Sequence, residues 1–191
     1  MANAPLNTAL LDQAIIFAVR AHAGTERRGK GYPYIVHPLE AMEIVATMTP
    51  DQELLAAAVL HDTVEDTDVT VEQIRAEFGD RIASLVADES EERPQGVSDE
   101  ESWHDRKRAA IDHLAKASHD AKIVSLGDKL SNMRAIARDY AEIGDALWNR
   151  FHSKNPKDHE WHYRGLADAL RELSDTNAFQ EFEQLINQVF N

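Results

Sequence analysis

Apolar side chains recur at intervals of three and four residues along most of this chain, and two clear series lie within residues 10–21 and 123–137. This spacing places the apolar residues on one face of an α-helix, whereas a half-buried strand would need an alternation of two. Glycine, which weakens helices, is scarce, with 8 in the whole chain. The sequence therefore predicts an all-α fold.

Local signals predict where the first helices begin and end. The pair His37-Pro38 opens a helix, because proline is tolerated in a first helical turn. Thr49, with Gln52 three residues later, predicts a capping box at the start of the next helix. That helix is apolar along residues 54–59 and leads into His61-Asp62. A short hairpin is expected around residues 29–35, before the first of these helices.

Further signals divide the rest of the chain. Thr70 with Gln73 predicts a short helix that Gly79 ends. Residues 88–102 are acidic and polar and contain proline and glycine, which predicts a solvated loop that could also act as a lid. Helices are expected over residues 103–117 and 120–140. Two or three more should follow, with a break near residues 155–156.

The composition excludes several classes of protein. The chain has no cysteine, so it offers neither a disulfide framework nor a thiolate metal site. Its 34 acidic and 20 basic residues give a formal charge of −14, which argues against a nucleic-acid polymer as partner. A small phosphorylated substrate remains compatible with this charge, provided that a metal ion and a local group of basic side chains offset the repulsion.

The length and the apolar runs predict one cytoplasmic domain. At 191 residues the chain can build a substantial core, so residues 1–191 are expected to form a single domain. Residues 1–9 lack the basic segment and apolar run of a secretory signal. No apolar run approaches the roughly 20 residues that span a bilayer, so no membrane association is expected. The sequence leaves open whether the protein forms a homo-oligomer.

The most informative segment is residues 60–67, where four ionisable side chains follow an almost entirely apolar helix. Charge is costly to bury, so a cluster of this kind needs a partner or a function. If the helix continues, His61 and Glu65 lie one turn apart, as do Asp62 and Asp66. An adjacent imidazole and carboxylate can both reach one metal ion, because neighbouring helix positions diverge by only about 100°.

Two ligands do not complete a metal site, so others must come from elsewhere in the chain. His37 stands at a predicted helix start, and Asp128 interrupts an apolar stretch with Asn132 four residues later on the same face. Two imidazoles and two carboxylates suit manganese, iron, zinc or cobalt. The alternative without a metal is that His61-Asp62 is a surface pair and that Asp128 is a buried acid held by hydrogen bonds. The remaining histidines are taken as structural or surface residues: His22, His104, His113, His119, His152, His159 and His162.

Four segments together resemble the HD phosphohydrolases, and more closely the Rel/Spo alarmone hydrolases. They are residues 24–30 (GTERRGK), 33–39 (PYIVHPL), 61–67 (HDTVEDT) and 126–134 (LGDKLSNMR). The resemblance covers residues 8–175, the expected core of the domain. The chain also carries WNRF and WHYR in its last third, and with these segments it is similar to the stand-alone small alarmone hydrolases.

The resemblance implies a helical HD-domain bundle and a site for one divalent metal ion, with manganese as the usual metal. It implies that the metal ligands are His37, His61, Asp62 and Asp128. It also implies that the ion would polarise a phosphate and lower the pKa of a bound water, which Glu65 and Asp66 would position or deprotonate. The substrate contacts implied are Arg27 on the nucleobase, Arg28 beside it, Asn132 on the ribose side and Lys107 on a phosphate.

The function implied is removal of the 3′-pyrophosphate from guanosine tetra- or pentaphosphate, the alarmone of the stringent response.

The chain departs from the family at residues 85–90, where the Rel/Spo proteins usually have a Gly-Val-Thr-Lys stretch, and His162 stands where the small hydrolases often have tyrosine. An alternative is the same chemistry on another phosphorylated nucleotide, such as an adenosine alarmone or the 2′-phosphate of NADPH. A second alternative is a non-enzymatic nucleotide-binding or antitoxin-like protein.

Overall fold

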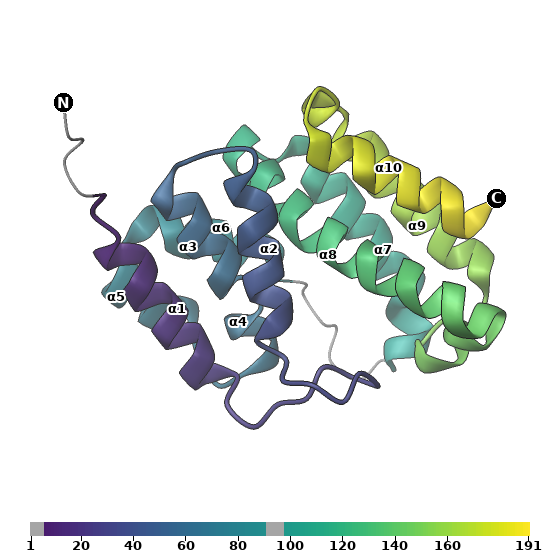
Figure 1. Cartoon of the computed structure of the whole chain (residues 1–191), viewed down its shortest axis with the longest axis horizontal. Coiled ribbons are helices and arrows are strands. Elements are labelled where there is room, and N and C mark those ends of the chain that lie inside the picture. The colour runs from purple at the N-terminus through teal and green to yellow at the C-terminus, as the bar shows by residue number, and fades with distance from the viewer. Residues whose placement is uncertain (1–5, 91–97) are drawn as a thin grey trace. The chain divides into compact units, whose positions relative to one another are not determined.

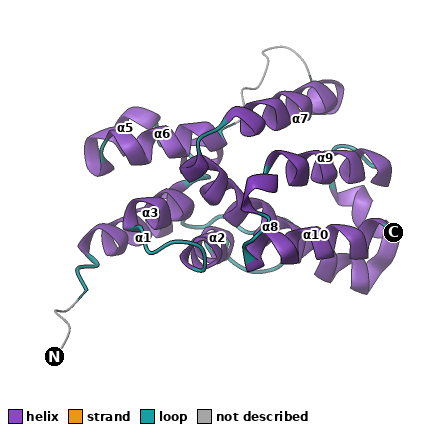
Figure 2. Ribbon diagram, turned by 90° about the horizontal axis from the view of Figure 1, so that it is seen from above, coloured by secondary structure: helices purple, strands orange, loops and turns teal. Residues whose placement is uncertain are grey.

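The computed structural model describes residues 6–90 and 98–191 of the chain, which fall into two compact units, Met1–Ser90 and Glu91–Asn191. Both units are built from helices, and the described residues contain no strand (Figure 2). The all-α prediction is therefore confirmed. Within the same described ranges, every helix is too short or too polar to cross a membrane.

The first unit surrounds one apolar helix. Its helices are α1 (Ala9–Ala21), α2 (Val36–Ala46), α3 (Gln52–Leu60), α4 (Thr63–Asp66), α5 (Val71–Phe78) and α6 (Asp80–Glu89). Every residue of α3 from Leu54 to Leu60 is buried, and the helix packs against α1, α2 and α6 (Figure 1). A helix that is apolar on all sides belongs in a core. Its three consecutive alanines keep it narrow, which lets neighbouring helices approach closely.

The second unit is organised along its longest helix. It contains α7 (Asp99–Lys116), α8 (His119–Ile143), α9 (Pro156–Ala169) and α10 (Asn177–Phe190), with 3-10 turns η1 (Gly144–Arg150) and η2 (Arg171–Leu173). Helix α8 packs against α10 and η1, while α9 packs against α7 and α10. The apolar series predicted over residues 123–137 is buried in α8. Pro156 occupies the first turn of α9 behind the N-cap Asn155, which explains the predicted break there.

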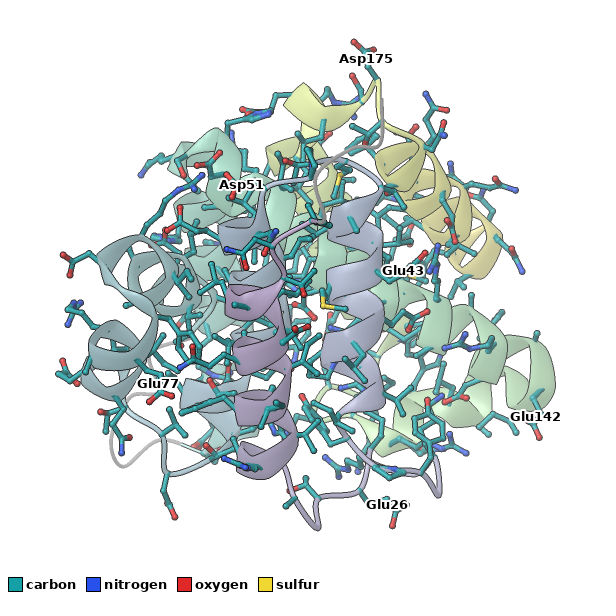
Figure 3. The ribbon with its side chains drawn as sticks, turned by 60° about the vertical axis from the view of Figure 1, so that its left-hand side comes forward. Glu26, Glu43, Asp51, Glu77, Glu142 and Asp175 are labelled. Carbon is teal, nitrogen blue, oxygen red and sulfur yellow. The ribbon has the colours of Figure 1, made fainter. Side chains whose placement is uncertain are left out.

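The predicted cap of α3 is wrong. The N-cap is Asp51, whose carboxylate accepts a hydrogen bond from the backbone N–H of Glu53 at 3.0 Å. Thr49 instead accepts from the N–H of Asp51 at 3.2 Å, so it stabilises the turn before the helix. Asp51 also pairs with Arg81 of α6 at 2.9 Å, a tertiary contact that local sequence does not reveal. Figure 3 shows Asp51 at this end of α3.

The boundaries around residues 88–102 also differ from the prediction. Helix α6 continues to Glu89, and α7 begins at Asp99 rather than near residue 103. Ser98 and Glu101 form a reciprocal capping box that starts α7. The central part of the predicted loop, residues 91–97, lies outside the described residues. The capping box predicted at Thr70 is confirmed, and α5 ends at Gly79 as expected.

The core of the second unit yields a stability prediction at Phe182. This ring is fully buried in α10 and meets Tyr163 of α9 edge-on, with ring centroids 6.2 Å apart. We expect Phe182→Ala to lower the free energy of unfolding by about 3–5 kcal/mol, because it removes apolar contacts and leaves a cavity. Denaturant titration measures this difference. The exposed neighbour Glu183 is the matched control, and a loss no larger for Phe182→Ala than for Glu183→Ala would contradict the packing.

Candidate metal centre

The loop between α1 and α2 is folded tightly by its own backbone. Glu26 and Pro33 form a single antiparallel bridge, where the predicted hairpin would have needed paired strands. The N–H of Arg27 donates to the carbonyl of Tyr32 at 2.9 Å, and the N–H of Tyr34 donates to that of Thr25 at 2.9 Å. Figure 3 shows Glu26 on this loop. The fold of the loop brings Arg27 over the ring of Tyr34, with 5.2 Å from its Cζ to the ring centroid.

Two imidazoles and one carboxylate meet within the first unit. His37 lies in the first turn of α2, and His61 and Asp62 directly follow α3. One oxygen of Asp62, Oδ2, lies 3.3 Å from Nε2 of His37 and 2.9 Å from Nε2 of His61. Both histidines are buried, whereas the Asp62 side chain is 18% exposed. The nitrogen and oxygen donors converge as a metal site requires, and the Asp62 side chain keeps a small solvent exposure.

The backbone fixes the orientation of His61. Its Nδ1 lies 2.7 Å from the carbonyl oxygen of Ala58, one turn earlier in the chain. A carbonyl can only accept, so Nδ1 carries the proton and the lone pair of the neutral ring lies on Nε2. That is the nitrogen directed at Asp62. This orientation of an imidazole by a backbone carbonyl is common among histidines that bind metals.

Asp62 remains ionised in this setting. Burial raises the pKa of Asp62. When His61 and His37 are protonated, their charges and N–H groups face this carboxylate, outweigh the burial and hold the pKa of Asp62 well below its usual range. The hydroxyl of Tyr34 also donates to Oδ2 at 2.7 Å. Burial, together with the adjacent Asp62 carboxylate, raises the pKa of Tyr34, so its proton stays on the phenol and donates. The carboxylate is therefore available to bind a cation.

The predicted catalytic pair lies in α4. The helix does not run on unbroken: α3 ends at Leu60, a turn holds His61 and Asp62, and α4 resumes at Thr63. The N–H of Asp66 still donates to the carbonyl of Asp62 at 2.9 Å, which keeps one helical turn across the break. Glu65 is partly buried and Asp66 is exposed. After burial and Asp62, the Asp66 carboxylate also raises the pKa of Tyr34, and it partly opposes the burial that lowers the pKa of His22.

In the second unit, Asp128 is buried within α8. Its Oδ1 accepts from Nδ2 of Asn132 at 2.5 Å, and its Oδ2 pairs with Nζ of Lys129 at 2.6 Å. Asp128 and Asn132 thus share one face of the helix, as their spacing predicts. Lys107 lies on α7, where its positive charge acts on the partly buried His162. Arg28 is exposed on the loop of the first unit.

Several residues of these clusters were not anticipated from the sequence. The sequence indicates Tyr34 only as part of a motif, and its position three residues before His37 is the signal for its contact with the site. No sequence pattern distinguishes Lys129, although it neighbours Asp128. Three histidines taken as structural or surface residues are largely enclosed in their units: His22, His159 and His162.

His162 gives the stability of the protein a pH dependence. Burial lowers the pKa of His162 well below the ordinary histidine value of 6.5, and the charges of Lys107 and Lys129 lower it further. The unfolded chain therefore binds a proton that the folded protein excludes, so stability is complete above about pH 6.5 and is lost as pH falls. We expect His162→Phe to flatten the fall in unfolding free energy between about pH 6.5 and 5, by up to about 1.4 kcal/mol per pH unit. Denaturant titrations across this range measure it, and a slope equal to that of the wild type would contradict it.

Known proteins resemble this chain over most of its length. Residues 14–155 match the protein family described as HD domain. A Danio rerio protein named guanosine-3′,5′-bis(diphosphate) 3′-pyrophosphohydrolase MESH1 is 38% identical, over 96% of this chain and 94% of that protein. A Mus musculus protein of the same name is 31% identical over 95% and 93%. A Vibrio cholerae guanosine-3′,5′-bis(diphosphate) 3′-pyrophosphohydrolase is 36% identical over 77% of this chain and 22% of its own length.

Two solved structures share the fold. One, described as a metazoan orthologue of SpoT that hydrolyses ppGpp, aligns with a TM-score of 0.76 at 24% identity and covers 97% of this chain and 98% of that one. The protein lmo0812 from Listeria monocytogenes aligns with a TM-score of 0.70 at 28% identity, covering 81% and 98%. The arrangement of helices described above is therefore one that solved structures already contain.

Proposed function

Because the chain belongs to the HD domain family, we propose that it is a metal-dependent hydrolase that removes the 3′-pyrophosphate from guanosine 3′,5′-bis(diphosphate). The observation that carries this proposal is the meeting of His37, His61 and Asp62 at one carboxylate oxygen. The relatives named for this reaction match the chain along nearly their whole length, which supports the same substrate. We also propose that residues 1–191 act as one functional domain in the cytoplasm.

The residue types fit a divalent ion. His37, His61 and Asp128 each offer one ligand atom, two nitrogens and a carboxylate oxygen, and such a set could hold a metal. We propose that Asp62 joins them and that manganese is the physiological ion, since mixed imidazole and carboxylate ligands suit it. When bound, the ion supplies Lewis-acid polarisation of a phosphate oxygen and acidifies a water molecule.

The protein side chains would supply the remaining chemistry. Glu65 and Asp66, on α4 directly after the His61-Asp62 pair, would orient the attacking water and accept its proton. The oxygen of the water forms a bond to the phosphorus attached to the 3′ oxygen, and the bond between that phosphorus and the 3′ oxygen breaks. The pyrophosphate carries the new oxygen away, and the 3′ oxygen takes up a proton to become the 3′-hydroxyl of guanosine 5′-diphosphate. Glu65 and Asp66 lie within five residues of the proposed ligands His61 and Asp62 along the chain, which supports this role.

Four side chains would hold the substrate. Arg27 would pack its planar guanidinium on the guanine base, with Arg28 beside it on the same loop. Asn132 would contact the ribose side of the substrate, because its side chain donates a hydrogen bond to Asp128, a proposed metal ligand. Lys107 would bind a phosphate, and its positive charge offsets part of the repulsion from the acidic protein.

The test is a single-turnover and steady-state assay with purified protein, manganese and guanosine 3′,5′-bis(diphosphate). The expected products are pyrophosphate and guanosine 5′-diphosphate, and chelation of the metal should abolish their formation. Protein that contains the metal but releases no pyrophosphate would contradict the proposal. Faster release of orthophosphate from another nucleotide, such as NADPH, would favour the alternative substrate.

A further inference from the structure

Tyr34 contacts the proposed metal centre at Oδ2 of Asp62. Its hydroxyl donates to Oδ2 of Asp62 at 2.7 Å, and this is the oxygen that faces both His37 and His61. The phenol is a donor here, because a carboxylate can only accept. Asp62 lies in the turn between α3 and α4, and its side chain makes no capping hydrogen bond to the start of α4. The hydroxyl of Tyr34 supplies a constraint that the turn lacks.

The ring of Tyr34 is itself enclosed by three side chains. Its centroid lies 4.9 Å from that of His22 and 5.9 Å from that of His37, the second contact being edge-on. Arg27 places its Cζ 5.2 Å from the same centroid. Neither ring nitrogen of the buried His22 makes a hydrogen bond to a described residue, so His22 contributes its ring surface as a wall for Tyr34. The tyrosine is thus fixed at both its ring and its hydroxyl.

We propose that Tyr34 is a positioning residue that serves both halves of the site: its hydroxyl holds the metal ligand Asp62, and its ring supports Arg27. This inference rests on the proposed function, in which Asp62 binds the metal and Arg27 binds the base. An outer partner of this kind reduces the freedom that a ligand must lose when the ion binds. A guanidinium lying over an aromatic ring is likewise oriented before the substrate arrives.

Two substitutions at Tyr34 separate the two contributions. Tyr34→Phe removes only the hydroxyl, so we expect the Kd for manganese to rise by about tenfold or more, kcat to fall, and KM to change little. Tyr34→Leu removes the hydroxyl and the aromatic ring, so it should show the same metal defect and, in addition, a higher KM. Isothermal titration with manganese alone measures the first effect without any substrate, and steady-state kinetics measures the split between kcat and KM.

The matched control is Tyr32→Phe, which loses a hydroxyl from the same loop and should keep the manganese Kd and the kinetics of the wild type. Thermal unfolding of each variant identifies a general loss of structure, and if Tyr34→Leu does not fold, the metal titration of Tyr34→Phe decides alone. A Tyr34→Phe protein with the manganese Kd of the wild type would overturn the inference. A wild type that binds manganese but does not hydrolyse guanosine 3′,5′-bis(diphosphate) would overturn the proposed function instead.

Discussion

Replacing Asp62 with asparagine should lower kcat/KM by a factor on the order of 10³ or more, because metal polarisation of a phosphate is worth several kcal/mol. The change keeps the size of the side chain and removes its charge. Asp62 is the carboxylate between His37 and His61, so its loss would remove one proposed ligand and the negative charge that faces the other two proposed ligands. Metal content, measured by plasma mass spectrometry after dialysis, should fall together with activity.

The control for this substitution is Asp68→Asn. Asp68 is an exposed aspartate in the turn that follows α4, so its substitution removes the same charge without touching the cluster. It should retain the metal content and kcat/KM of the wild type. Full activity in a folded Asp62→Asn protein would show that the carboxylate is not a ligand and would revive the non-enzymatic alternative.

Replacing Glu65 with glutamine should reduce kcat by a factor of about 10² to 10⁴, the range expected when a general acid–base group is lost. Unlike Asp62→Asn, this variant should keep its manganese, because Glu65 lies one turn after the proposed ligand His61 and is proposed to act on water. Single-turnover hydrolysis isolates the chemical step, and metal titration shows whether binding is preserved.

Glu72→Gln is the matched control, since Glu72 is an exposed glutamate on the neighbouring helix α5. It should behave as the wild type in both measurements. If Glu65→Gln lost manganese in proportion to its activity, Glu65 would belong among the ligands, and the proposed division of roles would be wrong.

Most of the helices were predictable because they bury an apolar face whose period is visible in the sequence. The buried series of α8 and the wholly apolar α3 are the clearest cases. Caps were less predictable, because several residues compete for each one. Thr49 satisfies the capping-box pattern, yet Asp51 caps α3, since its carboxylate reaches the N–H of Glu53 and pairs with Arg81. That pairing joins helices distant in sequence, and no local pattern contains it.

The candidate site likewise contains residues that the sequence predicts and residues that only the fold reveals. His37, His61 and Asp62 could be proposed from residue type and position, because charge beside an apolar helix needs a reason. The role of Tyr34 could not, since a tyrosine before a helix is usually a packing residue. Its significance comes from the fold of the loop, which turns its hydroxyl toward Asp62 and its ring toward Arg27. Contacts of this kind depend on tertiary structure.

The most direct test of the metal centre is a crystal structure of the protein grown with manganese, with diffraction data collected where manganese scatters anomalously. We expect one anomalous peak, within coordinating distance of Nε2 of His37, Nε2 of His61 and the carboxylates of Asp62 and Asp128. Absence of a peak at these residues, or an ion bound elsewhere while they face away from it, would contradict the proposed metal site.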